Sequence, residues 1–329
     1  MNIDVELKNH LLCETLINNI IPPTLLEARG VINGIDTVVD VFMKTFIQQI
    51  HDTFTEGEVI KTYDNPDILK GISTFFTNFQ ILLRTHKSEK SSYHGGTYPS
   101  SVKFDNTTNR WYCEPYITLT INASTEKKLF SIIKTILAHE LTHCYNMFLY
   151  SKQNNKDVFN NIEKQQRYYY IKRASDSNSN NERAIANILY LLNRMERNAN
   201  IAQLREELLD NKEKMTDDKS IFDLIKSSDS YRKLKTLEKN INLINTLTNE
   251  YTQKQLIKYV NQIMGKNYTN YNQVKKYLNN RWNKWKNAYL CKACKVAYDV
   301  FLTTGRSTCL DWGLHTNDLP TLKETPDEE

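Results

Sequence analysis

The chain has 329 residues, of which 40% are hydrophobic and 25% charged, and its formal net charge at pH 7 is +5. This composition is ordinary for a globular protein with an ample core, and so mild a positive charge does not by itself indicate a nucleic-acid partner. The six cysteines are too sparse for a disulfide scaffold, so we expect reduced thiols. The first residues carry charges without an apolar signal segment, and no apolar run is long enough to span a bilayer.

The first 85 residues are predicted to form an N-terminal helical region, 1–85. Apolar residues recur at helical spacing over 3–20, and Pro22 and Pro23 then end the helix. The same spacing predicts a second helix over 24–54. A third helix is predicted over 66–84, because Pro66 suits a first helical position and several phenylalanines line one side.

A short β region is predicted after residue 86. Residues 94–96 (HGG) predict a loop, and 105–109 have turn composition between two short strands. In Pro115–Asn122 apolar residues alternate with Thr and Asn, which predicts a strand with one buried face. We therefore expect a predominantly helical α+β fold with a small antiparallel sheet, whose edge strand packs on the helix that follows.

That helix contains the most specific motif of the chain. Ser124 is a suitable N-cap, and apolar residues continue at helical spacing to Leu149. Within it His139-Glu140-Leu141-Thr142-His143 matches the pattern H-E-x-x-H. Residues four apart share one helix face, so the two imidazoles can bind one zinc ion. Glu140 would lie beside the metal as general base toward a water that the metal activates; the alternative is a pair of ordinary polar histidines.

A third ligand is needed, because a catalytic zinc ion takes three protein ligands and keeps one position open. Only His315 follows His143, in no recognisable motif, so we expect a carboxylate from a later helix. Glu196 is favoured because it follows a buried apolar run and is followed by the small Ala199. Asn200, one turn further on, would orient a ligand histidine. The other candidates are Glu163, Glu182, Glu206 and Glu207.

The second half of the chain is predicted to be helical almost throughout. Helices are expected over 157–171, 182–192, 196–209, 219–226, 228–249, 252–264 and 271–304, with Asn193 as a break. This pattern predicts a core at 86–210, a C-terminal helical region at 211–317 that packs on it, and a disordered tail at 318–329.

Two further patterns allow other interpretations. Cys291 and Cys294, with Cys309 and His315 beyond, resemble a structural zinc site, but free cysteines are commonly small buried hydrophobes. Basic residues alternate with aromatic ones over 266–295, which suits a nucleic-acid platform. Trp282 and Trp285 share a helix face, however, and this spacing first indicates core packing.

The motif and its surroundings resemble zinc metallopeptidases of the gluzincin type, in which a Glu on a later helix completes an H-E-x-x-H site. Residues 190–202, around Glu196, resemble the third-ligand helix of small phage-associated metallopeptidases; the resemblance covers about 90–210. It implies one zinc ion per chain on His139, His143 and Glu196, and a strand, here Pro115–Asn122, that binds the substrate backbone. Such families often have Asp four residues after the Glu, where this chain has Asn200.

The sequence therefore predicts a zinc-dependent peptidase with Glu140 as general base and a peptide or protein as substrate. A cytoplasmic or virion-packaged location without a membrane partner is expected. The alternative is a non-catalytic helical structural or interaction protein, virion-associated or nucleic-acid-binding, in which the motif is incidental. The oxyanion donor stays open among Tyr168, Tyr169, Tyr170, His94 and His315.

Overall fold

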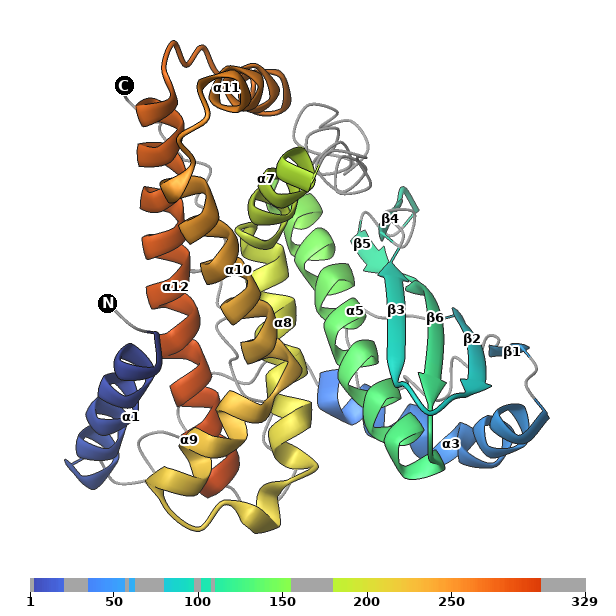
Figure 1. Ribbon diagram of the computed structural model, residues 1–329. Coiled ribbons are helices and arrows are strands. Elements are labelled where there is room, and N and C mark those ends of the chain that lie inside the picture. The colour runs from blue at the N-terminus through green and yellow to red at the C-terminus, as the bar shows by residue number, and fades with distance from the viewer. Residues whose placement is uncertain are drawn as a thin grey trace.

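The computed structural model describes residues 3–20, 35–56, 59–62, 80–97, 102–107, 110–154 and 180–302. Figure 1 shows a small sheet with helices against it on one side of the molecule and a group of long helices on the other. The prediction of a mainly helical α+β fold is confirmed. None of the helices in these ranges combines the length and the apolarity needed to cross a membrane.

The main sheet is mixed rather than antiparallel as predicted. Its strands are β1 (Val59–Thr62), β2 (Gln80–Lys87), β3 (Ser92–Thr97) and β6 (Tyr116–Ala123), in the order β1-β2-β6-β3. β2 and β6 pair in parallel, whereas β3 pairs antiparallel to β6. A separate hairpin joins β4 (Val102–Asp105) to β5 (Arg110–Cys113), as the turn composition predicted. β6 lies inside the sheet, so the expectation that 115–122 form the edge strand is wrong. Among the strands that the structure describes, β1 and β3 are the two edges, and β3 is the one beside β6.

Two other predictions for this region are wrong. Residues 80–84, predicted as the end of a helix, begin β2, in which Ile81, Leu83 and Thr85 are buried on one face. Short apolar runs do not distinguish a strand from a helix by pattern alone. The expected loop at 94–96 belongs to β3, where Gly95 lies opposite Leu119 of β6. Its two glycines conceal the strand, because glycine is rare in strand interiors.

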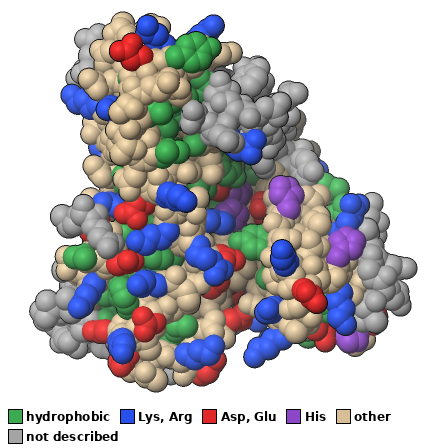
Figure 2. All heavy atoms as spheres, in the orientation of Figure 1, with side chains coloured by type: hydrophobic (Ala, Val, Ile, Leu, Met, Phe, Trp, Pro, Cys, Tyr) green, Lys and Arg blue, Asp and Glu red, His purple; other side chains and the backbone are tan. Residues whose placement is uncertain are grey.

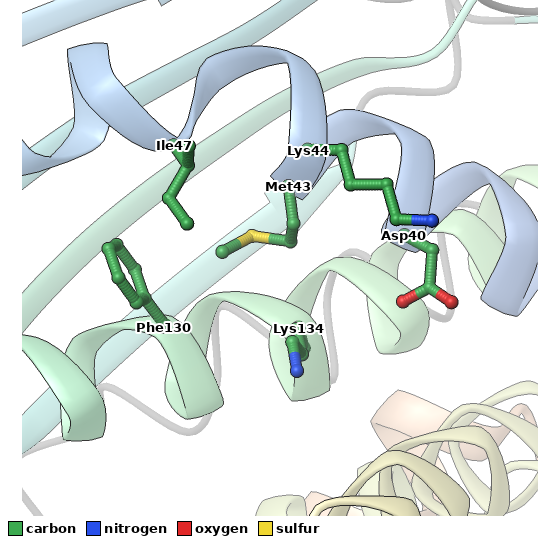
Figure 3. A pocket seen from close by; sticks show the side chains of 6 residues that line it. All are labelled: Asp40, Met43, Lys44, Ile47, Phe130 and Lys134. Atoms are coloured by element: carbon green, nitrogen blue, oxygen red, sulfur yellow. The ribbon is translucent and has the colours of Figure 1, made fainter.

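The motif helix, α5 (Glu126–Asn154), lies between the sheet and the helical half (Figure 1). Thr125 caps it rather than Ser124, since the Thr125 hydroxyl accepts a hydrogen bond from the Lys128 amide at 3.3 Å. α3 (Ile35–Glu56) packs on α5, and the buried side chains of both helices and of the sheet form one apolar core. A pocket between α3 and α5 is lined by Asp40, Met43, Lys44, Ile47, Phe130 and Lys134, and includes none of the motif residues (Figure 3).

The other half is helical, as predicted, with a second apolar core. Its elements are α1 (Ile3–Ile20), α7 (Asn180–Leu191), α8 (Arg194–Leu209), a short 3-10 turn (Lys212–Lys214), α9 (Asp218–Ser227), α10 (Asp229–Thr246), α11 (Glu250–Met264) and α12 (Tyr271–Leu302). α8 packs between α12 and α5 and so connects the two halves. α1 packs on α12, far along the chain. The division into 1–85, 86–210 and 211–317 stays a prediction, and residues 157–171 and the tail at 318–329 lie outside the described residues.

Candidate metal centre

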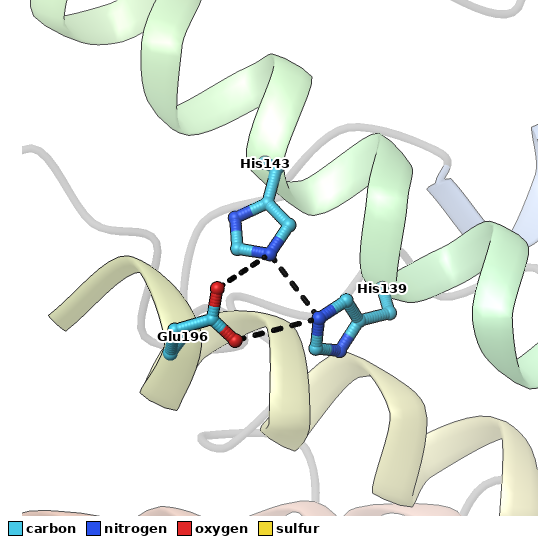
Figure 4. A group of neighbouring side chains, drawn as sticks. All are labelled: His139, His143 and Glu196. Carbon is cyan, nitrogen blue, oxygen red and sulfur yellow. Dashed lines mark hydrogen bonds and ion pairs between the residues drawn. The ribbon is translucent and has the colours of Figure 1, made fainter. Parts of the chain in front are cut away.

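α5 and α8 bring three predicted ligands together (Figure 4). The Nε2 atoms of His139 and His143 are 3.1 Å apart. Glu196, in the first turn of α8, places Oε1 at 3.2 Å from His143 Nε2 and Oε2 at 3.7 Å from His139 Nε2. All three side chains are buried. Among the described residues, the three are the one group of His, Cys, Asp or Glu side chains that lie close enough together to hold a metal ion.

The spacing of these donor atoms fits a tetrahedral metal ion. Zinc binds imidazole nitrogen and carboxylate oxygen at about 2.0–2.2 Å, which puts the donor atoms of a tetrahedral site roughly 3.3–3.5 Å apart. The observed separations of 3.1, 3.2 and 3.7 Å lie on either side of this range. Two nitrogens and one oxygen are also a donor set that zinc accepts. The residues therefore fit a zinc ion with one position left open.

The surroundings of His139 favour its neutral form. Burial lowers its pKa well below the usual value, and the nearby charges of Lys233 and His143 act in the same direction. Glu196 and the backbone of Ala199 raise it, but by less. A histidine must be neutral to coordinate a metal, so the environment favours the binding form at neutral pH.

Glu196 is held in its ionised form. Burial by itself would raise its pKa, but the charge and hydrogen bond of His143, the charge of His139 and a hydrogen bond from Tyr190 together lower it far below its ordinary range. Tyr190 lies in the last turn of α7, three residues before the break at Asn193. Its hydroxyl therefore fixes the carboxylate from outside the ligand set, a role that the sequence did not reveal.

The general-base candidate, Glu140, is fixed by the edge strand β3. Thr97 Oγ1 donates a hydrogen bond to Glu140 Oε2 at 2.7 Å. Gly95 lies so near the carboxylate that a Cβ there would stand 2.6 Å from Glu140 Oε1 and 2.6 Å from Ile136 Cγ2. The glycine is thus required by close approach rather than by a turn, which explains a glycine inside a strand.

Gly95→Ala should displace Glu140 and reduce any hydrolytic activity while the metal stays bound. The added methyl group cannot fit at 2.6 Å, and a shift of about 1 Å in a reacting group costs about a hundredfold in rate. Gly96→Ala is the matched control, because its Cβ would meet only Thr118 Oγ1, at 3.4 Å. Rates and zinc content of the two variants should be compared; equal losses of activity would show that Gly95 has no special role.

The remaining sequence candidates lie elsewhere. Glu206 and Glu207 are further along α8 and outside the ligand group, and Asn200 Oδ1 accepts a hydrogen bond from Lys233 at 3.2 Å. No hydrogen bond of Asn200 to a ligand histidine is found, so its predicted orienting role is not supported. The His94 side chain is exposed. The structure does not describe the side chains of Glu163, Tyr168, Tyr169, Tyr170, Glu182, Cys309 or His315.

The cysteine and tryptophan patterns have structural explanations among the described residues. Cys294 is buried in the second core, and its thiol lies 4.0 Å from the Leu7 carbonyl oxygen. Cys291 and Cys294 belong to no group that could hold a metal within the described ranges. Trp282 and Trp285 are both buried and stack on each other, with ring centroids 6.2 Å apart. They are therefore not available to stack on nucleic-acid bases.

Glu207 titrates near neutrality. Burial raises its pKa from 4.5 to about 7, against smaller opposing effects of Gln203, Lys233 and Arg232. The folded protein therefore binds a proton at Glu207 between these two pH values that the unfolded chain does not. The associated stability is present below the unfolded pKa and is lost as the pH rises through about 7.

Glu207→Gln should remove this pH dependence. The raised pKa corresponds to at most about 3 kcal/mol, so the unfolding free energy of the variant should gain up to that amount relative to the original protein between pH 4.5 and 8. Denaturant unfolding at both pH values measures the difference. If the unfolding free energies of the two proteins differed by the same amount at pH 4.5 and at pH 8, Glu207 would titrate in the folded protein as it does in the unfolded chain.

In comparisons with known proteins, no family model, no curated protein and no solved structure matches this chain. The functional argument therefore depends on the geometry of the site alone.

Proposed function

We propose that the chain is a zinc-dependent hydrolase. The observation on which this depends is the buried cluster of His139, His143 and Glu196, with donor atoms at the spacing of a metal site and a glutamate beside it. More particularly, we propose a peptidase of the gluzincin type, because a Glu from a later helix completes the H-E-x-x-H pair. Its substrate is a peptide or protein.

The residues divide the chemistry among them. A zinc ion bound by His139, His143 and Glu196 would act as a Lewis acid that polarises the scissile carbonyl group and acidifies a water. Glu140 takes the proton of the attacking water and delivers it to the departing amine. Thr97 holds one oxygen of that carboxylate and Gly95 lies against the other, so β3 fixes the orientation in which Glu140 takes and delivers the proton.

The substrate is expected to lie along β3 rather than along 115–122. β6 is paired on both sides, by β2 and β3, and cannot accept a further strand. β3 pairs with β6 alone among the strands that the structure describes. An extended peptide would add to its outer edge by main-chain hydrogen bonds, beside Glu140.

The alternative, a non-catalytic structural or interaction protein, is less well supported by the site. The two imidazoles and the carboxylate lie 3.1–3.7 Å apart in the interior and form the donor set of a metal site, which an incidental motif would not require. The tryptophans of the proposed nucleic-acid platform are in the core.

A peptide-library assay tests the proposal. Zinc-loaded protein should hydrolyse some members of a mixed peptide library, detected by mass spectrometry. Chelation should stop hydrolysis, and added zinc should restore it. Hydrolysis that persists after complete zinc removal, or none from zinc-loaded protein over a broad library, would contradict the proposed function.

A further inference from the structure

Lys233, on α10, is a cation beside the metal centre that the chemistry above does not use. Its Nζ donates hydrogen bonds to Gln203 Oε1 at 2.9 Å and to Asn200 Oδ1 at 3.2 Å. Both acceptors are neutral amides. Among the described residues Lys233 forms no ion pair, although its side chain is partly buried. An ammonium has three N–H donors, so one donor and the charge remain for a ligand.

The position of Lys233 relative to the metal follows from α8. Glu196, Asn200 and Gln203 are spaced four and three residues apart and so share one face of that helix. Because Nζ contacts both amides, it lies between one and two turns beyond Glu196, roughly 6–10 Å along the helix axis. Lys233 is coupled electrostatically to the site: its charge lowers the pKa of His139. Burial lowers the pKa of Lys233 itself, against the smaller opposing effects of Glu196, Glu207 and Glu140.

Side chains beyond Lys233 connect the two halves of the molecule. Tyr93, on β3, donates a hydrogen bond to Asp229 Oδ2 at 3.2 Å and accepts one from Gln203 Nε2 at 3.4 Å. Figure 2 shows the surface hollowed between the two halves, with histidine and acidic side chains at the base and basic side chains on the helical side below them. A peptide along β3 would therefore meet these bridging side chains shortly after it passes the metal.

The distance from the metal decides what Lys233 can bind. A donor to the oxyanion of the scissile carbonyl must stand about 3 Å from an atom that touches the metal, and the roughly 6–10 Å estimated above for Lys233 exceeds this. One extended residue spans about 3.5 Å. A metal–oxygen bond of about 2 Å, one such residue and a charge-assisted hydrogen bond of about 2.8 Å together span roughly 8 Å. This length lies within the distance estimated for Lys233, so its ammonium can reach a group one residue from the scissile bond.

We propose that Lys233 is a specificity-determining residue that binds a substrate carboxylate one residue from the scissile bond. The inference rests on the proposed peptidase function and names its substrate class. The carboxylate has two possible sources, the C-terminal carboxylate of the peptide or an Asp or Glu side chain, and both present the same anion to the ammonium. Asn200 and Gln203 position the cation without neutralising it.

A binding experiment with small anions tests this without a known substrate. Glutarate and succinate have one carboxylate for the metal and a second for Lys233, whereas pentanoate and butyrate of equal chain length have one. Zinc-loaded protein should bind each dicarboxylate ten- to a hundredfold more tightly than its monocarboxylate partner, as measured by titration calorimetry. Lys233→Gln, which is neutral and of similar length, should abolish this preference, and Lys233→Arg should keep most of it.

Failure of this inference can be distinguished from failure of the proposed function. If the protein binds zinc but does not prefer dicarboxylates, or if Lys233→Gln keeps the preference, the role of Lys233 is wrong while the metal site stands. If no zinc binds, the proposed function itself fails, and the inference with it. Lys233→Gln should also bind zinc as the original protein does, which separates lost recognition from misfolding.

Peptides then distinguish the two sources of the carboxylate. For a C-terminal carboxylate, amidation of the peptide should reduce kcat/KM at least tenfold in the original protein and not in Lys233→Gln. For a side chain, exchanging Asp or Glu beside the scissile bond for Asn or Gln should have that effect instead. Insensitivity of the original protein to both changes would overturn the proposal.

Discussion

Glu140→Gln should abolish peptide hydrolysis and leave zinc binding intact. An amide cannot accept the proton of the attacking water, and loss of general acid–base catalysis lowers rates by about 10²–10⁴-fold. Glutamine has nearly the same shape, and Thr97, whose hydroxyl now donates to Glu140 Oε2 at 2.7 Å, can also accept a hydrogen bond from an amide. The fold should therefore tolerate the change. Zinc content and hydrolysis rate should be measured on the same preparation.

Glu126→Gln is the matched control, with the same substitution on the same helix. Glu126 is at the exposed start of α5, where it pairs with His51 at 2.6 Å. Exposed pairs of this kind contribute little, so activity and zinc content should be unchanged. If Glu140→Gln kept the activity of the original protein, Glu140 would not be the base and the proposed mechanism would be wrong.

Glu196→Gln should weaken zinc binding more than a hundredfold. The carboxylate lies 3.2 Å from His143 Nε2 and supplies the negative charge of the ligand set. Mutation of residues that merely support a ligand already costs 10–100-fold in metal affinity, so loss of a charged ligand should exceed that range. Competition with a chromophoric chelator gives the dissociation constant.

Glu207→Gln, on the same helix, is the matched control for Glu196. Glu207 contacts Gln203 and the Asp229 amide, at 2.9 and 3.0 Å, and belongs to no metal-binding group in the described ranges. Zinc affinity should therefore stay within a few-fold of the original. If Glu207→Gln weakened zinc binding as much as Glu196→Gln, Glu196 would lose its assignment as the third ligand.

The local parts of the fold and site were predictable from the sequence. Helical spacing located α8 and the break at Asn193, and alternation located β6 with its buried Ile117, Leu119 and Ile121. The H-E-x-x-H spacing placed His139 and His143 on one face. The apolar run before Glu196, which was expected to be buried, favoured this residue over the other glutamates as the third ligand. The structure places its carboxylate beside the two histidines.

What the sequence did not reveal depends on contacts between distant segments. The pairing of β2 with β6, which puts β6 inside the sheet, cannot be inferred from alternation within either strand. Thr97 and Gly95 act on Glu140 from β3, and Lys233 approaches α8 from α10. A single threonine, glycine or lysine has no local pattern that marks such a role. The glycine pair at 95–96 was the one available signal, and it also suits a loop.

The zinc content of the protein tests the central claim most directly. The chain should be purified under mild conditions without chelators and analysed by elemental and native mass spectrometry. The geometry of His139, His143 and Glu196 predicts about one zinc ion per chain, which His143→Ala should lose. Protein that is free of zinc as purified, and that takes up none when zinc is added, would contradict the account.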